Sequence, residues 1–341
     1  MLGAGAVGAN VVRQLASTPQ VTSVALADDD GDRARRVATA VAEKGRVRAV
    51  GVERWWQGAD VAVLAAAAGP HPAMAERMLE AGVSVVSVSD DVAEVRGLLA
   101  LDGRAREREC SVVVGAGFAP GLTCVMARHA ASGFDQVDEL HVAKTGTASS
   151  SRGRAYLDAM RDQSLDWRDG GWVRRRGGSG RELCWFPEPV GAKDCYRASA
   201  PDALVLVPAF PGVDRVTARV SAGPGDRLSA KLPGLRRAGH DDRLGAVRVE
   251  VRGHRHGAYD SAVLGAVDRP AVAAGAVAAV AAVAAGTGAL ARTGAAGLAE
   301  LADPPSFLGE LARRGVKVAA FVGTASTGTA ATGTAPQPAV C

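Results

Sequence analysis

The chain of 341 residues is 48% hydrophobic and 22% charged, and its formal net charge is +4. These values are ordinary for a globular protein and leave room for two domains with substantial cores, so they exclude a fibrous or disordered chain. The arginines are scattered along the sequence and form no stripe interleaved with aromatic residues, so we do not expect nucleic acid to be a partner.

A glycine-rich run, Gly3-Ala4-Gly5-Ala6-Val7-Gly8, fits the pattern G-x-G-x-x-G and leads into a helical stretch over residues 9–16. In dinucleotide-binding units the first glycine permits the strand-to-helix turn, the second lets backbone approach a pyrophosphate, and the third lets the helix pack on the strand. Only Met1 and Leu2 precede the run, whereas a strand normally has about five residues. We therefore expect the natural chain to begin several residues upstream, with an apolar run.

An apolar run from Val21 to Ala27 ends in Asp28-Asp29-Asp30, and Asp28 lies twenty positions after the last glycine of the loop. A carboxylate at this place accepts hydrogen bonds from the ribose hydroxyls of NAD and would repel the 2′-phosphate of NADP. The sequence therefore predicts NAD or NADP as the cofactor and favours NAD. Two alternatives stay open: Arg33 and its neighbours could bind a 2′-phosphate, and three aspartates also suit a turn and helix cap.

The first half of the chain alternates strands with helices. Short apolar strands without polar alternation indicate burial on both faces, so we predict an α/β fold with a Rossmann doubly wound parallel sheet over residues 1–120. Beyond the run at 21–27, the expected strands are 47–50, 61–67, 83–88 and 112–114, and the expected helices are 32–44, 72–81 and 92–108.

After Pro120 the rhythm changes to alternating strands at 137–144, 215–221 and 247–252. They predict a second α+β domain over residues 121–323 with a largely antiparallel sheet, ending in helices at 271–291 and 305–314. The strand at 247–252 has valines on one face and charged residues on the other. Its polar face is where a homodimer could form. The tail, residues 324–341, is rich in threonine, alanine, glycine and proline and is predicted to be disordered.

The apolar stretch 271–291 is long enough to raise the question of a membrane span. It is built of alanine, valine and glycine and is interrupted by Gly286-Thr287-Gly288, so we predict a close-packed helix with small residues at its contact and no membrane partner. The five cysteines form no C-x-x-C pair, and their odd number argues against a disulfide framework. We therefore expect a cytoplasmic protein.

A proline-glycine turn lies in the segment Val113-Val114-Gly115-Ala116-Gly117-Phe118-Ala119-Pro120-Gly121-Leu122. This segment and several other motifs together resemble the saccharopine dehydrogenase-like family of NAD(P)-dependent oxidoreductases. The other motifs are the G-A-G-x-V-G loop, Gly69-Pro70, Glu80-Ala81-Gly82-Val83 leading to Ser89-Asp90, and Asp303-Pro304 through Phe307-Leu308 to Arg314-Gly315-Val316. They cover the chain from Leu2 to about Gly323. The chain departs from the family at Ala119 and Ser87, where members often have aspartates, and at Asp29, where an arginine is common.

The resemblance implies hydride transfer at a C–N bond of a small amino-acid-like or imine substrate. The alternatives are a reductase of a C=C or C=O bond and a non-catalytic nucleotide-binding regulatory protein. Ligands of open parallel sheets bind beyond the carboxyl ends of the strands, which places the loops 69–71, 87–91 and 117–121 around the nicotinamide. The expected cofactor-binding residues are Gly3, Gly5, Ala6, Val7, Gly8, Asp28, Asp29, Ala67, Gly69 and Gly117.

Three residues are candidates for proton transfer: His71, Asp90 and Lys144. His71 and Asp90 also suit the starts of helices, as a polar N-terminal residue and a capping acid. Lys144 and His141 have opposite parity on one strand, so only one can face the cleft, and we favour Lys144.

For the substrate we expect contacts from Pro120 and from Arg152, which ends a hydroxyl-rich loop that could hold a carboxylate or could be a flexible surface loop. His254 and His256 have a spacing that a metal could use. Further ligands are lacking, and no metal site is expected.

Overall fold

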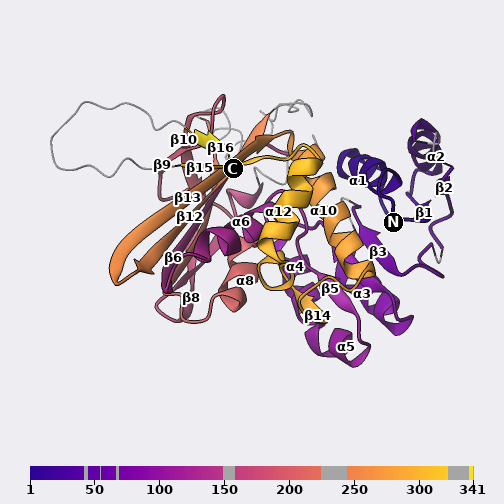
Figure 1. Cartoon of the computed structure of the whole chain (residues 1–341), viewed down its shortest axis with the longest axis horizontal. Helices are drawn as coiled ribbons and strands as arrows, with labels where there is room; N and C mark the ends of the chain where they lie inside the picture. The colour runs from indigo at the N-terminus through magenta and orange to yellow at the C-terminus, as the bar shows by residue number, and fades with distance from the viewer. Residues whose placement is uncertain are drawn as a thin grey trace.

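The computed structural model describes residues 1–41, 45–53, 55–66, 69–148, 158–223, 244–321 and 338–340. Figure 1 shows two sheets side by side, with the N-terminal part of the chain around one sheet and the long strands of the second half forming the other. Helices α10 (Pro270–Gly286) and α12 (Pro304–Arg313) lie between them in this view. One hydrophobic core contains residues from both parts, among them Leu64, Leu140 and Val247.

The first sheet is parallel throughout, as predicted. Leu2 forms parallel bridges to Ala27 on one side and to Leu64 on the other, so it joins a two-stranded piece to a four-stranded piece. It donates to Val63 O (2.9 Å) and accepts from Ala65 N (2.8 Å). The strands of this sheet are β1 (Val24–Leu26), β2 (Val47–Ala49), β3 (Val61–Leu64), β4 (Ser84–Ser87), β5 (Ser111–Val113) and β14 (Gly294–Ala296). Their order across the sheet is β2-β1-Leu2-β3-β4-β5-β14.

The helices of this half follow the predicted alternation, with one correction. The single helix expected at 92–108 is two helices, and Asp102, the first residue of the second helix, contacts the segment around β14. Its carboxylate accepts a hydrogen bond from Ala295 N (2.8 Å) and one from Arg292 Nη1 (3.0 Å). The helices are α1 (Ala6–Ala16), α2 (Gly31–Ala40), α3 (His71–Glu80), α4 (Val92–Leu99) and α5 (Asp102–Glu107).

Among the residues that the structure describes, the second sheet has ten strands and is antiparallel except for the β6–β11 pair, which confirms the predicted α+β character. Helix α6 (Leu122–Ala131) packs against β6, β12 and β13, and the short helix α8 (Asp202–Leu206) packs against β11 and continues into the 3-10 turn Val207–Ala209. The strands are β6 (Gln136–Thr145), β7 (Gln163–Arg168), β8 (Gly171–Arg176), β9 (Glu182–Trp185), β10 (Ala192–Arg197), β11 (Arg215–Ser221), β12 (Gly245–Arg255), β13 (Ala258–Asp268), β15 (Val318–Phe321) and β16 (Pro338–Val340).

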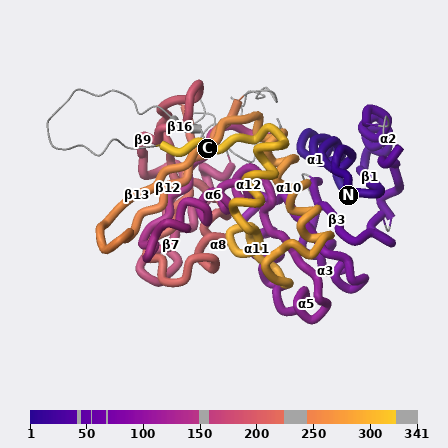
Figure 2. The backbone as a smooth tube through the Cα atoms, viewed as in Figure 1, coloured from indigo at the N-terminus to yellow at the C-terminus, as the bar shows by residue number. Residues whose placement is uncertain are grey.

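The chain returns to the first sheet between β13 and β15 of the second sheet, which corrects the expected division at residue 120. Helix α10 packs on α1, β3 and β4, and β14, which the sequence did not predict, pairs with β5. The short helix α11 (Leu298–Leu301) follows. Figure 2 shows this orange and yellow C-terminal segment lying beside the indigo and violet N-terminal one. Helix α10 and β14 thus belong to the dinucleotide-type unit, whereas α11 and α12 pack on α6 of the second domain.

Helix α10 makes the close contact predicted for a helix of small residues. A Cβ added at Gly275 would lie 2.5 Å from Asn10 Cβ and 3.0 Å from Val11 N, so glycine lets α10 lie directly against α1. Among the described residues, no helix is long and apolar enough to cross a membrane. Within the tail expected to be disordered, Pro338–Val340 instead pairs with β15, and the rest of the tail lies outside the described residues.

Candidate functional site

One cavity of about 900 Å³ is lined by residues from both halves of the chain. At one end lie the glycine loop and the end of β1, and at the other lie the end of β6 and the segments before β7 and α8. The residues that line this cavity include Gly3, Gly5, Ala6, Val7, Asp28, Asp29, Arg33, Ala65, Ala66, Asp90, Asp91, Glu94, Gly117, Phe118, Ala119, Lys144, Asp158, Asp162 and Ser199.

The three glycines of the loop have different surroundings. Gly3 has a φ of +102°, and a Cβ there would lie 2.5 Å from Ala66 N. A Cβ on Gly8 would lie 1.9 Å from Gly3 O, so α1 packs directly on the loop and Gly8 lies beneath the cavity wall rather than in it. Gly5 is the N-cap of α1, and no atom lies within 4 Å of its Cβ position. The amide groups of the first turn of α1 therefore face a space open to a ligand.

The acids after β1 organise the neighbouring end of the cavity. Asp28 Oδ2 accepts a hydrogen bond from Ala4 N (2.6 Å), and its Oδ1 accepts one from Asp30 N (2.9 Å). Arg33 Nε lies 3.4 Å from Asp28 Oδ1, and its Nη2 lies 3.6 Å from Asp30 Oδ2. Asp30 also caps α2 by accepting from Arg33 N (3.0 Å). Asp28 thus fixes the glycine loop to the strand end, while Asp29 is exposed at the cavity.

The loops at the carboxyl ends of β3, β4 and β5 form the wall between the two ends, as expected from the sheet topology. Gly117 is part of this wall. Pro120, expected to contact substrate, is buried instead: it packs over Gly115, where a Cβ would lie 2.5 Å from the Pro120 Cγ. Gly69 is not among the lining residues either, and Ala67 lies outside the described residues.

Lys144, near the end of β6 in the second sheet, lies beside this wall of the cavity. Its Nζ donates a hydrogen bond to Ala119 O (3.1 Å) and lies 3.8 Å from Asp90 Oδ2. The side chain is 14% exposed and lines the cavity. Ala119 follows β5 and Asp90 follows β4, so one ammonium group connects two loops of the first sheet with a strand of the second. Two of the three candidates for proton transfer, Lys144 and Asp90, are therefore together.

His71, the third candidate, is buried beside the wall and is not among the lining residues. Its Nδ1 lies 2.9 Å from Ser87 Oγ, and its Nε2 lies 3.2 Å from Ala66 O. Glu94 Oε2 is 3.7 Å from the same Nδ1, and Ser89 Oγ donates to this carboxylate. His71 therefore supports residues of the wall rather than facing the cavity.

Sequence reasoning missed several polar lining residues: Glu94, Asp158, Asp162 and Ser199. The first lies in the opening turn of α4, where an acid is ordinary, and no pattern marked the others. Arg152, the expected partner for a substrate carboxylate, lies outside the described residues.

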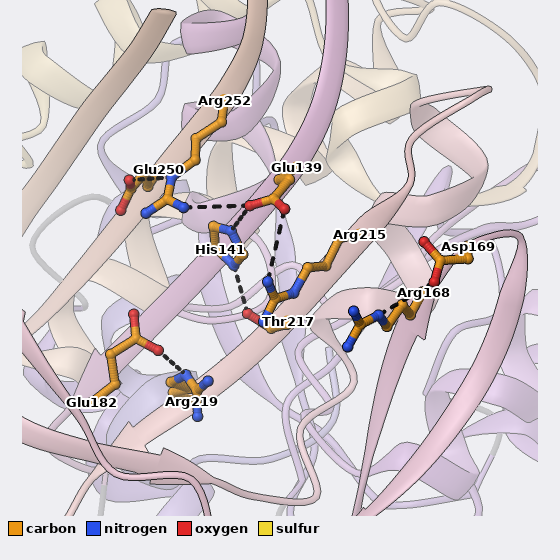
Figure 3. Close-up of polar contacts among 10 residues, drawn as sticks. All are labelled: Glu139, His141, Arg168, Asp169, Glu182, Arg215, Thr217, Arg219, Glu250 and Arg252. Carbon is orange, nitrogen blue, oxygen red and sulfur yellow. Dashed lines mark hydrogen bonds and ion pairs between the residues drawn. The ribbon is translucent and has the colours of Figure 1, made fainter.

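His141 points to the face of the second sheet that is turned away from Lys144. Its Nδ1 lies 2.8 Å from Thr217 Oγ1 and its Nε2 lies 2.8 Å from Glu139 Oε2 (Figure 3). Burial lowers the pKa of His141, although the hydrogen bond to Glu139 opposes this. Figure 3 shows further ion pairs beside it, among them Arg252 with Glu250 and Arg219 with Glu182. A homodimer through this face stays a prediction.

His254 and His256 have the spacing that a metal could use. His254 Nδ1 lies 3.1 Å from Asp138 Oδ2, and the described ranges contain no group of three or more metal-type ligands.

Comparisons with known proteins agree with this architecture. Residues 1–100 match the family described as "Semialdehyde dehydrogenase, NAD binding domain". The structure is similar to apo saccharopine dehydrogenase (L-Glu forming) from Saccharomyces cerevisiae, with a TM-score of 0.69 and 13% identity over 94% of this chain and 99% of that one. It is also similar to C. glutamicum DAP dehydrogenase in complex with DAP, with a TM-score of 0.51 and 15% identity over 90% and 93% of the chains. No curated protein matches the sequence. The resemblance to saccharopine dehydrogenase-like proteins is therefore confirmed for the fold.

Proposed function

We propose that the chain is an NAD(P)-dependent oxidoreductase that transfers hydride at the carbon–nitrogen bond of a small amino-acid-like or imine substrate. The observation that carries the proposal is that residues at the N-terminus of α1 and Lys144 line the same cavity. The match of residues 1–100 to an NAD-binding domain and the fold shared with two amino-acid dehydrogenases support it.

The described residues fit a dinucleotide. The space above Gly5 leaves the N-terminus of α1 open to a pyrophosphate, and Gly3 keeps the turn tight beneath it. A bound nicotinamide would supply or accept the hydride. We propose a preference for NAD over NADP, because Asp28 and Asp29 present negative charge at the expected ribose end and the charge of Arg33 is already balanced by two carboxylates.

We propose that Lys144 donates the proton to the substrate nitrogen. A C=N bond accepts hydride readily only when its nitrogen is protonated, and an ammonium group that lines the cavity can donate that proton. The hydrogen bond to Ala119 O fixes the direction of the side chain, and the Asp90 carboxylate lies 3.8 Å from its Nζ. In the reverse direction the neutral amine of Lys144 would take the proton from the substrate nitrogen.

The test is a steady-state assay of NADH consumption with 2-oxo acids in the presence and absence of amines, on the parent chain and on Lys144→Met. The proposal expects turnover that requires the amine and that the variant largely loses. Lys193→Met is the matched control, because Lys193 is exposed on β10 and does not line the cavity. Equal rates without amine would indicate a carbonyl reductase instead. Tight cofactor binding without any turnover would indicate a regulatory protein.

A further inference from the structure

Glu94 is an acid of the cavity wall that has no part in the proposed proton transfer. It lies in the opening turn of α4, its side chain is 24% exposed, and it lines the cavity. Its Oε2 accepts a hydrogen bond from the Ser89 hydroxyl, and His71 Nδ1 lies 3.7 Å from the same oxygen. Within the described ranges, Oε1 makes no hydrogen bond. One oxygen of this carboxyl group is therefore held by the protein, and the other can accept from a ligand in the cavity.

Asp91, the neighbouring acid of the wall, is already used by the helix. Its Oδ1 accepts hydrogen bonds from Ala93 N and Glu94 N, both at 2.9 Å, so Asp91 is the N-cap of α4. Asp91 N donates to Ser89 Oγ (3.2 Å), and this hydroxyl donates in turn to Glu94. The cap and the hydroxyl together fix the first turn of α4 and the side chain of Glu94 that extends from it.

A buried imidazole connects Glu94 with the glycine loop. His71 is 1% exposed, and its Nε2 lies 3.2 Å from Ala66 O, which can only accept, so Nε2 carries a hydrogen. Ala66 packs on Gly3, because a Cβ at Gly3 would lie 2.5 Å from Ala66 N. The other ring nitrogen, Nδ1, is the one near Glu94. Glu94 is therefore separated by one imidazole ring from the segment that packs on the glycine loop.

We propose that Glu94 binds the hydroxyl groups of the ribose that carries the nicotinamide. The inference rests on the proposed function, in which the pyrophosphate lies at the N-terminus of α1 and Lys144 protonates the substrate at the end of the cavity formed by β6. This ribose is bonded directly to the pyrophosphate, so it has to lie next to the glycine loop, before the nicotinamide and the substrate. Its two adjacent hydroxyls can donate, and a carboxylate oxygen is a strong acceptor for them.

The experiment titrates the full chain with ADP and with ADP-ribose, because the second probe adds the terminal ribose to the first. Glu94→Gln keeps an oxygen that can accept from Ser89 but loses the negative charge that strengthens hydrogen bonds to the ribose. We expect its Kd for ADP-ribose and for NADH to rise about tenfold, while its Kd for ADP stays within about twofold of the parent value. An unchanged Kd for ADP-ribose in the folded variant would overturn the inference, and so would an equal loss of affinity for ADP.

Glu80→Gln is the matched control. Glu80 is the last residue of α3, is exposed and does not line the cavity. The substitution removes the same charge from the same half of the chain, so it should leave the Kd of all three ligands unchanged. If it weakened ADP-ribose as much as Glu94→Gln does, the effect would come from overall charge and the inference would be wrong.

A second measurement uses the parent chain and does not depend on a variant folding. An ADP-ribose analogue without the 2- and 3-hydroxyls of its terminal ribose should bind about tenfold more weakly than ADP-ribose. Equal affinity for the two would overturn the inference. None of these titrations needs a substrate or turnover, so they remain decisive if the proposed hydride transfer fails. A Glu94→Gln variant with a raised substrate KM and an unchanged Kd for ADP-ribose would place Glu94 at the substrate and contradict the inference while the proposed function stands.

Discussion

Replacing Gly5 by alanine separates a ligand-binding role of the glycine loop from a structural one. Gly5 has φ −70° and ψ −169°, which any residue adopts, and no atom lies within 4 Å of its Cβ position. The methyl group should therefore leave the free energy of unfolding within about 0.5 kcal/mol of the parent. It would project where we place the pyrophosphate and disturb its hydrogen bonds to the amides of α1, at a cost of about 2–3 kcal/mol. That cost corresponds to about a 30- to 150-fold weaker Kd for NADH.

The assay is a fluorescence titration with NADH together with thermal unfolding of each variant. Gly309→Ala is the control, because Gly309 lies in α12, has no atom near its Cβ position and does not line the cavity. It should bind NADH as the parent does. An unchanged Kd in a fully folded Gly5→Ala variant would show that no dinucleotide phosphate lies against this helix.

Four further predictions concern other parts of the chain. Lys144→Met should lower kcat by about 10²- to 10⁴-fold while the Kd for NADH measured by titration stays within about threefold. Asp28→Ala should shift the ratio of NADPH to NADH affinity by about tenfold toward NADPH, and an unchanged ratio in parallel titrations would remove Asp28 from cofactor selection. Gly275→Val should destabilise the fold by about 2 kcal/mol or more in urea unfolding, because its side chain must enter the α1–α10 contact. Burial alone would raise the pKa of Glu250, but its two arginine neighbours hold the pKa below the ordinary value of 4.5. The ionised carboxylate therefore stabilises the fold above pH 4.5. This stabilisation is lost as the pH falls through the lowered pKa. Glu250→Gln should therefore be less stable at neutral pH and lose less stability on acidification, as urea unfolding at several pH values would show.

The parallel sheet could be predicted because its cause is local. Strands β1, β3, β4 and β5 lie in short, largely apolar runs, and the glycine loop precedes its helix without interruption. Strand β14, Gly294-Ala295-Ala296, could not be predicted in the same way. Three small residues have no strand propensity of their own, and they pair with β5 only because α10 has returned the chain to that edge of the sheet.

The position of a candidate site residue could be predicted where a sequence motif fixes it, or where its odd or even place along a strand decides which face of the sheet it lies on. The parity of β6 separates Lys144 from His141, and the structure places the first at the cavity and the second on the opposite face. Pro120 and His71 lie in the expected loops but are buried behind the cavity wall, which the order of residues in a loop does not reveal.

The most direct test of the account is a parallel titration of the purified chain with NADH and NADPH, followed by energy transfer from tryptophan to the nicotinamide. Trp55 and Trp56, which are buried in the first half of the chain, can serve as donors. We predict saturable binding at one site per chain, with NADH bound more tightly than NADPH and with Gly5→Ala weakening both. Absence of binding by either nucleotide would contradict the assignment of the cavity to a dinucleotide, and with it the proposed hydride transfer.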